Sequence, residues 1–121
     1  MKVPGPAHPI EITANPNRVV VTFDGCRIAD TTDALSFNEA GYPTVAYIPR
    51  EDVDMSRLAR TAHTTHCPFK GDANYFSIES GDATAENAVW TYEDPYPAVA
   101  EVRDRLAFYT DKVELTEEPA T

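Results

Sequence analysis

Two of the three histidines and one of the two cysteines lie within residues 63–71, which read HTTHCPFKG. Residues 55–71 contain no carboxylate, although the whole chain has 20 acidic and 10 basic side chains. The same stretch carries Arg57, Arg60 and Lys70. Ammonium and guanidinium groups bind carboxylates and phosphates through charge-assisted hydrogen bonds. The stretch therefore predicts a site for a small anionic ligand, with Lys70 as its point charge.

Three side chains of this stretch are candidates for binding or catalysis. Thr65 is predicted to donate a neutral hydrogen bond to the ligand, His66 to transfer a proton and Cys67 to act as a nucleophile. Neighbouring residues of an extended chain point to opposite faces, which argues against a His66–Cys67 dyad. His63, His66 and Cys67 are also residue types that bind zinc. A structural zinc site needs a fourth ligand, however, and the chain has no Cys-x-x-Cys pair. We therefore predict no metal and no cofactor, while a metal-dependent function stays open as a third hypothesis.

Charged and aromatic residues elsewhere in the chain complete the predicted site. Arg50, Glu51 and Asp52 follow a predicted strand, a position at which folds often present functional side chains. We predict Arg50 as a bidentate clamp for the anion, Glu51 as a catalytic carboxylate and Asp52 as either a ligand-binding residue or a helix N-cap. Aromatic residues on strands more often belong to the core than to a ligand site. Those that could stack on a flat part of the ligand are Tyr75, Trp90, Tyr92 and Tyr109.

Composition limits the kind of protein this is. With 121 residues and 42% hydrophobic side chains, the chain is long enough for one globular domain. A formal net charge of −10 repels phosphate backbones, so we expect no nucleic acid partner. The apolar runs are too short to span a bilayer and the N-terminus lacks the apolar core of a signal peptide. We therefore expect a cytoplasmic protein with reduced cysteines and no membrane contact, and a homodimer stays open.

The elements that must position these residues are short strands, because the chain contains ten prolines. A hairpin is predicted around Asp24-Gly25, the pair favoured in two-residue type I′ turns, with Val21 opposite Ile28. Alternating or β-branched runs predict further strands at 34–39, 44–48, 74–79, 86–92, 106–110 and 112–115.

Helix is predicted only at 50–60, with Asp52 as N-cap, and at 98–104, while residues 63–71 are predicted as a loop. The fold class is mainly β: a small single domain of about seven short strands in two sheets or an open barrel, with one or two short helices. The expected organisation is an extended N-terminal arm at 1–17, a β domain at 18–115 and an acidic frayed tail at 116–121.

Four short segments occur in a characteristic order: YIPREDV at 47–53, THCPFKG at 65–71, AVWTY at 88–92 with Pro95 after it, and AFY at 107–109. In this order they resemble the domain of unknown function 427 family, over the chain from Arg18 to Leu115. The resemblance implies a small, mostly β fold similar to the Mss4-like or β-tent group, without an established activity.

Members of this family are sometimes named nucleotidyltransferase-like, but the residues of this chain do not support that activity. A polymerase-type transferase needs a Gly-Ser pair and spaced aspartates that hold Mg²⁺, and neither is evident. Tent-like relatives carry zinc on two Cys-x-x-Cys knuckles. This chain lacks both knuckles, so their metal is not carried over.

The leading hypothesis is a small-molecule pocket between the sheets, in which Lys70 and Arg50 hold an anionic ligand and His66 transfers a proton. Whether the protein turns this ligand over stays open. The alternative is a non-enzymatic module that binds a ligand or a protein partner.

Overall fold

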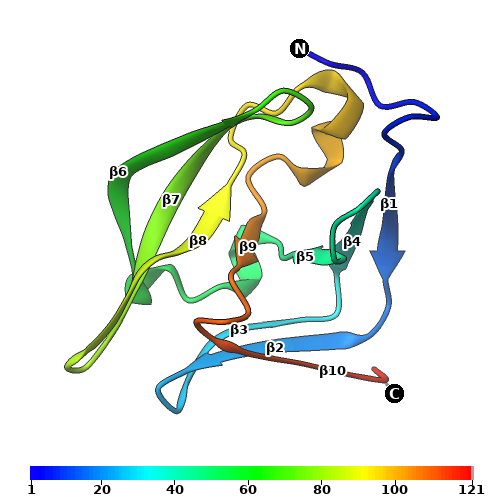
Figure 1. Cartoon of the computed structure of the whole chain (residues 1–121). Coiled ribbons are helices and arrows are strands. Elements are labelled where there is room, and N and C mark those ends of the chain that lie inside the picture. Colours follow the sequence, from blue (N-terminus) through cyan, green and yellow to red (C-terminus); the bar gives the residue numbers. More distant parts are fainter. Residues whose placement is uncertain (121) are drawn as a thin grey trace.

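Ten β-strands in three antiparallel sheets make up most of the computed structural model, which describes residues 1–120 (Figure 1). The first sheet has the strand order β1-β4-β5 and contains β1 (Ile10–Asn15), β4 (Ala34–Glu39) and β5 (Val45–Tyr47). The second, β10-β2-β3, contains β2 (Arg18–Phe23), β3 (Cys26–Thr31) and β10 (Glu114–Glu118). The third, β6-β7-β8-β9, contains β6 (Leu58–Cys67), β7 (Gly71–Ser80), β8 (Ala83–Thr91) and β9 (Leu106–Phe108).

The helical part of residues 1–120 consists of three short 3-10 helices, η1 (Arg50–Asp52), η2 (Met55–Arg57) and η3 (Pro97–Val102). None of them has the length and apolarity needed to cross a membrane. The predicted fold class, a small mainly β domain, is confirmed, with three open sheets in place of the predicted two sheets or open barrel. In Figure 1, β6 to β8 lie on the left, β1 and β4 on the right and the second sheet below, so the sheets surround the middle of the molecule.

The β2–β3 hairpin turns at Asp24-Gly25, as predicted. Asp24 and Gly25 have φ angles of 51° and 76°, the left-handed conformation that a type I′ turn requires at both positions. A β-bulge after Val21 then shifts the register, so that Val21 lies opposite Ala29 and not opposite Ile28. The predicted pairing is wrong at this point because loop length sets the register only as far as the first bulge.

The histidine-containing segment is a strand and not a loop. β6 pairs with β7 as far as Cys67, and Pro68 follows the strand, where its missing N–H interrupts no ladder. The predicted helix at 50–60 is replaced by η1, η2 and the start of β6. The residue that caps a helix here is Asp54, at the start of η2, and not Asp52.

Both ends of the chain take part in the sheets. β1 lies inside the segment 1–17, which the sequence predicts as an extended arm, and it pairs with β4. β10 extends into the predicted tail as far as Glu118 and pairs with β2. Thr121, the last residue of that tail, lies outside the described residues. Edge strands of this kind are hard to predict because their partners lie far away in the sequence.

The third sheet separates two hydrophobic clusters, because successive side chains of a strand point to opposite faces. Phe76 of β7 and Val89 of β8 pack on one face, in a cluster with residues of β2 and β3. Tyr75 and Trp90, their neighbours in the sequence, pack on the other face, in a cluster with residues of β4 and β5. This second cluster is the more polar one, because it contains the tyrosines Tyr47, Tyr75 and Tyr92.

Candidate functional site

A cavity of about 580 Å³ lies between the three sheets, and each sheet contributes to its wall. The first sheet supplies Phe37, Glu39 and the β4–β5 turn with Tyr42, the second supplies residues of β10, and the third supplies Trp90. Protein pockets for small organic molecules ordinarily measure about 300 to 1,000 Å³. The cavity is therefore large enough for a small ligand.

Aromatic side chains give the cavity stacking surfaces. Trp90 is the single tryptophan of the chain, and its ring lies 4.6 Å from that of Tyr109, centroid to centroid. Trp90 Nε1 donates a hydrogen bond to the buried Tyr47 Oη at 3.2 Å, which fixes the orientation of the indole. Tyr42 and Tyr109 are 65% and 38% exposed and mark the opening of the cavity toward solvent.

One side of the site carries three charged or titratable residues, His8, Glu39 and Lys70, which we call the lysine cluster. Lys70 Nζ donates to Glu39 Oε1 at 3.2 Å, and His8 Nε2 donates to Glu39 Oε2 at 2.6 Å. The side chains of Lys70 and Glu39 are only 17% and 8% exposed. The ammonium lies 5.1 Å from the centre of the Phe37 ring and 5.8 Å from that of Tyr92, within cation–π range. Lys70 thus contacts both a carboxylate and an aromatic surface.

The β6–β7 turn positions Lys70. Its N–H donates to the Cys67 carbonyl at 3.2 Å, and its carbonyl accepts from the Tyr96 N–H at 3.0 Å. Gly71 has a φ of 110°, which L side chains rarely adopt, and a Cβ there would lie 3.4 Å from the Asp94 carbonyl oxygen. The chain that follows β8 therefore packs directly on the turn and holds Lys70 beside the cavity.

A row of hydroxyl groups crosses the third sheet next to the cavity. Thr65 Oγ1 and Tyr75 Oη are 3.0 Å apart, and Tyr75 Oη and Tyr109 Oη are 3.4 Å apart. The His63 ring packs on Tyr75, with the centroids 4.5 Å apart. Burial raises the pKa of Tyr109 to about 12, and its hydrogen bond with Tyr75 acts in the same direction. The Tyr109 hydroxyl therefore stays protonated at neutral pH and does not act as a base.

Six of the predicted site residues lie together around this face of the third sheet. They are Thr65, Cys67, Lys70, Tyr75, Trp90 and Tyr92. Cys67, Lys70 and Trp90 line the cavity itself, and the other three lie beside it. Thr65 and Cys67 share a face because they are two positions apart on β6.

His66 lies on the opposite face of β6 from Thr65 and Cys67. Its Nδ1 contacts Asp72 Oδ1 at 2.7 Å, and its side chain is 56% exposed. The structure therefore does not bring the predicted proton-transfer group to the cavity. The same alternation separates His66 from the other two candidate zinc ligands. Within residues 1–120, no three His, Cys, Asp or Glu side chains are grouped closely enough to hold a metal ion.

Glu51 and Asp52 also lie away from the cavity. Both belong to η1, where Glu51 is exposed. Asp52 Oδ2 accepts a hydrogen bond from Thr31 Oγ1 at 2.7 Å, which ties η1 to β3. Asp52 thus has a structural partner in the second sheet.

A protein-family model described as a domain of unknown function (DUF427) matches residues 11–119 of the chain. The chain belongs to this family. The resemblance found in the sequence is confirmed, and the match extends beyond residues 18–115 to include most of β1 and all of β10. Comparison with the curated proteins finds no match.

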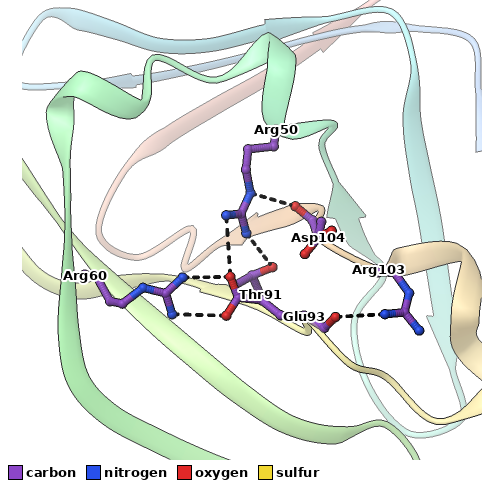
Figure 2. A network of polar contacts seen from close by, with 6 residues as sticks. All are labelled: Arg50, Arg60, Thr91, Glu93, Arg103 and Asp104. Carbon is purple, nitrogen blue, oxygen red and sulfur yellow. Dashed lines mark hydrogen bonds and ion pairs between the residues drawn. The ribbon is translucent and has the colours of Figure 1, made fainter.

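In this DUF427 domain, an internal carboxylate already binds the predicted arginine clamp (Figure 2). We call Arg50, Arg60 and Glu93 the arginine cluster. Arg60 holds Glu93 through two hydrogen bonds of 3.1 and 2.7 Å, and Arg50 Nη1 lies 3.5 Å from Glu93 Oε2. Arg50 also donates to Thr91 Oγ1 at 3.2 Å and to the Asp104 carbonyl at 3.1 Å. Arg50 is therefore engaged with protein acceptors on all three of its nitrogens.

The electrostatics of the arginine cluster agree with this pairing. The hydrogen bonds from Arg60 hold the pKa of the Glu93 carboxyl below its usual range, and Glu93 raises the pKa of Arg60. Both guanidinium groups lie over the Phe76 ring, on the face of the third sheet opposite to Tyr75. The positive charge of residues 55–71 is thus balanced by carboxylates from outside that stretch, which are Glu39, Asp54, Asp72 and Glu93.

The sequence does not identify two residues of this DUF427 site, His8 and Glu39. For Glu39 a signal exists, because it is two positions from the core residue Phe37 on a correctly predicted strand and so shares its face. No comparable signal exists for His8, whose partner Glu39 is 31 positions away.

Proposed function

We propose that the cavity of this DUF427 domain binds a small organic molecule with a flat apolar body and one anionic group. The observation that carries the proposal is the position of Lys70. Within the described residues it is the one basic side chain in the cavity wall, and it lies beside aromatic rings. The flat body would stack on Trp90 and Tyr109, and the anionic group would accept a hydrogen bond from Lys70 Nζ.

The carboxylates of the wall limit the charge of the ligand. A lysine ammonium has three N–H donors, and Glu39 takes one of them at 3.2 Å, so Lys70 can bind a further acceptor without losing its partner. Glu39 and Glu117 both line the cavity and would repel a polyanion. A single carboxylate or sulfonate therefore fits this wall better than a polyphosphate.

We propose binding, without turnover, as the main function. His66 lies on the other face of β6, and the two oppositely charged groups Glu39 and Lys70 are paired with each other. The second candidate is an enzyme in which Cys67 acts as a nucleophile. What favours this candidate is the place of Cys67 in the cavity wall.

Two finer expectations also stay proposals. Kinship with the Mss4-like or β-tent group is proposed from the family and from its small, open sheets. A cytoplasmic location is proposed because Cys26 and Cys67 are free and half-buried, as expected for thiols in a reducing compartment.

The test compares two fluorescent probes of similar shape. Anilinonaphthalene sulfonate has a flat aromatic body and one sulfonate, and N-phenylnaphthylamine has the same kind of body without the charge. Trp90 is the single tryptophan and lies in the wall, so its emission reports binding at the cavity. The Lys70→Met variant should bind the sulfonate probe about tenfold more weakly, or ~1.4 kcal/mol, and should bind the neutral probe as the wild type does.

Arg57→Met is the matched control, since Arg57 belongs to the same carboxylate-free stretch but contacts Asp54 and does not line the cavity. Equal losses in Lys70→Met and Arg57→Met, or no response of Trp90 to either probe, would show that the cavity is not the binding site. A thermal-shift screen of nucleotides, sugar phosphates and carboxylic acids then searches for the natural ligand, and we expect carboxylic acids to stabilise the wild type most.

A further inference from the structure

The N-terminal segment is docked on the turn that carries Lys70. The Lys2 N–H donates to the Pro68 carbonyl at 2.7 Å, and Gly5 and His8 exchange two backbone hydrogen bonds that fold the segment back. The His8 ring stacks on Phe69, with the centroids 3.9 Å apart and the planes at 10°. Figure 1 shows the N-terminus beside the β6–β7 turn. The segment thus brings an imidazole to the edge of the proposed ligand site.

Glu39 is shared between this imidazole and Lys70. One carboxylate oxygen accepts from His8 at 2.6 Å and the other from Lys70 at 3.2 Å. Because the Glu39 side chain is 8% exposed, water contributes little to its solvation, and the two protein partners supply most of it. A change of charge on His8 therefore changes how strongly Glu39 attracts the Lys70 ammonium.

The net charge of the lysine cluster follows the protonation of His8. With a neutral imidazole, the charges of Glu39 and Lys70 cancel. With an imidazolium, the cluster carries one positive charge, and that charge lies next to the cavity. Histidine is the residue type that ordinarily changes charge between about pH 5 and 8.

Other titratable groups surround His8 and Glu39. Lys2 Nζ lies 5.9 Å from the centre of the Phe69 ring, and Glu11 lines a surface depression together with Glu39. Cys67 and Tyr92 lie on the cavity side, near Lys70. Two further groups of types that ordinarily change charge near neutral pH lie close by: His63, whose ring packs on Tyr75, and the α-amino group of Met1, next to Lys2.

We propose that His8 is a positioning residue of the cavity: by binding Glu39 it determines how much of the Lys70 charge is available to an anionic ligand. Protonated His8 neutralises Glu39 and leaves Lys70 free to attract the anion. When His8 is neutral, Glu39 keeps its negative charge and attracts the Lys70 ammonium more strongly. This inference rests on the proposed function, that is, on an anion contacting Lys70 in the cavity.

The experiment measures the affinity of the full chain for anilinonaphthalene sulfonate between about pH 5.5 and 8, where the sulfonate stays ionised. The wild type should bind this probe roughly fivefold more tightly at the acidic end, the effect expected of one added charge near the site. His8→Gln keeps a hydrogen-bond donor but cannot become charged, so its affinity should change much less with pH than that of the wild type. His63→Gln and His66→Gln are the matched controls, because each removes an imidazole that does not bind Glu39, and both should keep the wild-type pH dependence.

A second variant keeps the test valid if His8→Gln unfolds. Glu39→Gln should bind the sulfonate probe more tightly than the wild type at the alkaline end, because the neutral amide no longer offsets the Lys70 charge. The same pH dependence in the wild type and in His8→Gln would overturn the role of His8, and so would a Glu39→Gln affinity at the alkaline end no higher than that of the wild type. An equal pH dependence for the neutral probe would also overturn it, because the effect would then not be one of charge. If Lys70→Met leaves sulfonate binding unchanged, the proposed function itself fails, and this result is separate from the pH profile.

Discussion

The arginine cluster and the lysine cluster lie on opposite faces of the third sheet, and both contain cations paired with a carboxylate. In the arginine cluster, Glu93 accepts two hydrogen bonds from Arg60 and lies 3.5 Å from an Arg50 nitrogen, and none of these three residues lines the cavity. In the lysine cluster, Glu39 takes one donor of Lys70, and the ammonium borders a cavity. A cation can serve a ligand only where its internal partner leaves a donor free and where space exists beside it. The arginines also keep free N–H donors, since a guanidinium has five, but they do not line the cavity, so Lys70 is the cation that meets both conditions.

The largest expected difference between the two clusters is in stability. Glu93→Gln removes the charge that pairs with two guanidinium groups, so we expect the free energy of unfolding to fall by about 1–2 kcal/mol. Binding of the sulfonate probe should stay unchanged, because Glu93 does not line the cavity. Urea unfolding and probe titration measure the two quantities. Glu101→Gln, at an exposed position, is the control. A variant that loses probe affinity as well as stability would show that the clusters are coupled.

A smaller difference between the clusters is expected in how the free energy of unfolding depends on pH. Arg60 lowers the pKa of Glu93 in the folded protein, so the carboxylate stabilises the fold above its unfolded pKa of about 4.3, and this stability is lost as the pH falls through the folded value. The stability difference between the wild type and Glu93→Gln should be constant above roughly pH 5 and shrink toward zero in more acidic solution. Urea unfolding at several pH values measures it. If the difference instead changes between neutral pH and roughly pH 5, a histidine and not Glu93 determines how the stability of the arginine cluster depends on pH, and the prediction is wrong.

The smallest effect is expected at His66, which belongs to neither cluster. Its contact with Asp72 is solvent-exposed, so His66→Ala should change the free energy of unfolding by less than about 0.5 kcal/mol. Affinity for the sulfonate probe should not change, because the side chain lies on the face of β6 away from the cavity. The same titrations measure both quantities. A loss of affinity as large as that of Lys70→Met would mean that the site includes both faces of β6.

The part of the site that could be predicted from the sequence is the part in which strand alternation alone places side chains on the same face. Thr65 and Cys67 share a face two positions apart, and Tyr75 pairs with Trp90 across the sheet, so these candidates lie together as residue type and period suggest. The sequence predicts His66 as a site residue, but its side chain points away from the cavity. Residues 63–71 are predicted as a loop, in which side chains do not alternate, whereas residues 58–67 form the strand β6.

The sequence alone determined the mainly β class, the type I′ turn at Asp24-Gly25 and the family, because these depend on residue types and on neighbours along the chain. It also drew attention to the excess of positive charge in residues 55–71. Only the tertiary structure decided which of those charges borders a cavity. The partner of Lys70 is 31 positions away and that of Arg60 is 33 positions away, so each pairing follows from how distant strands are arranged, which local residue preferences do not specify.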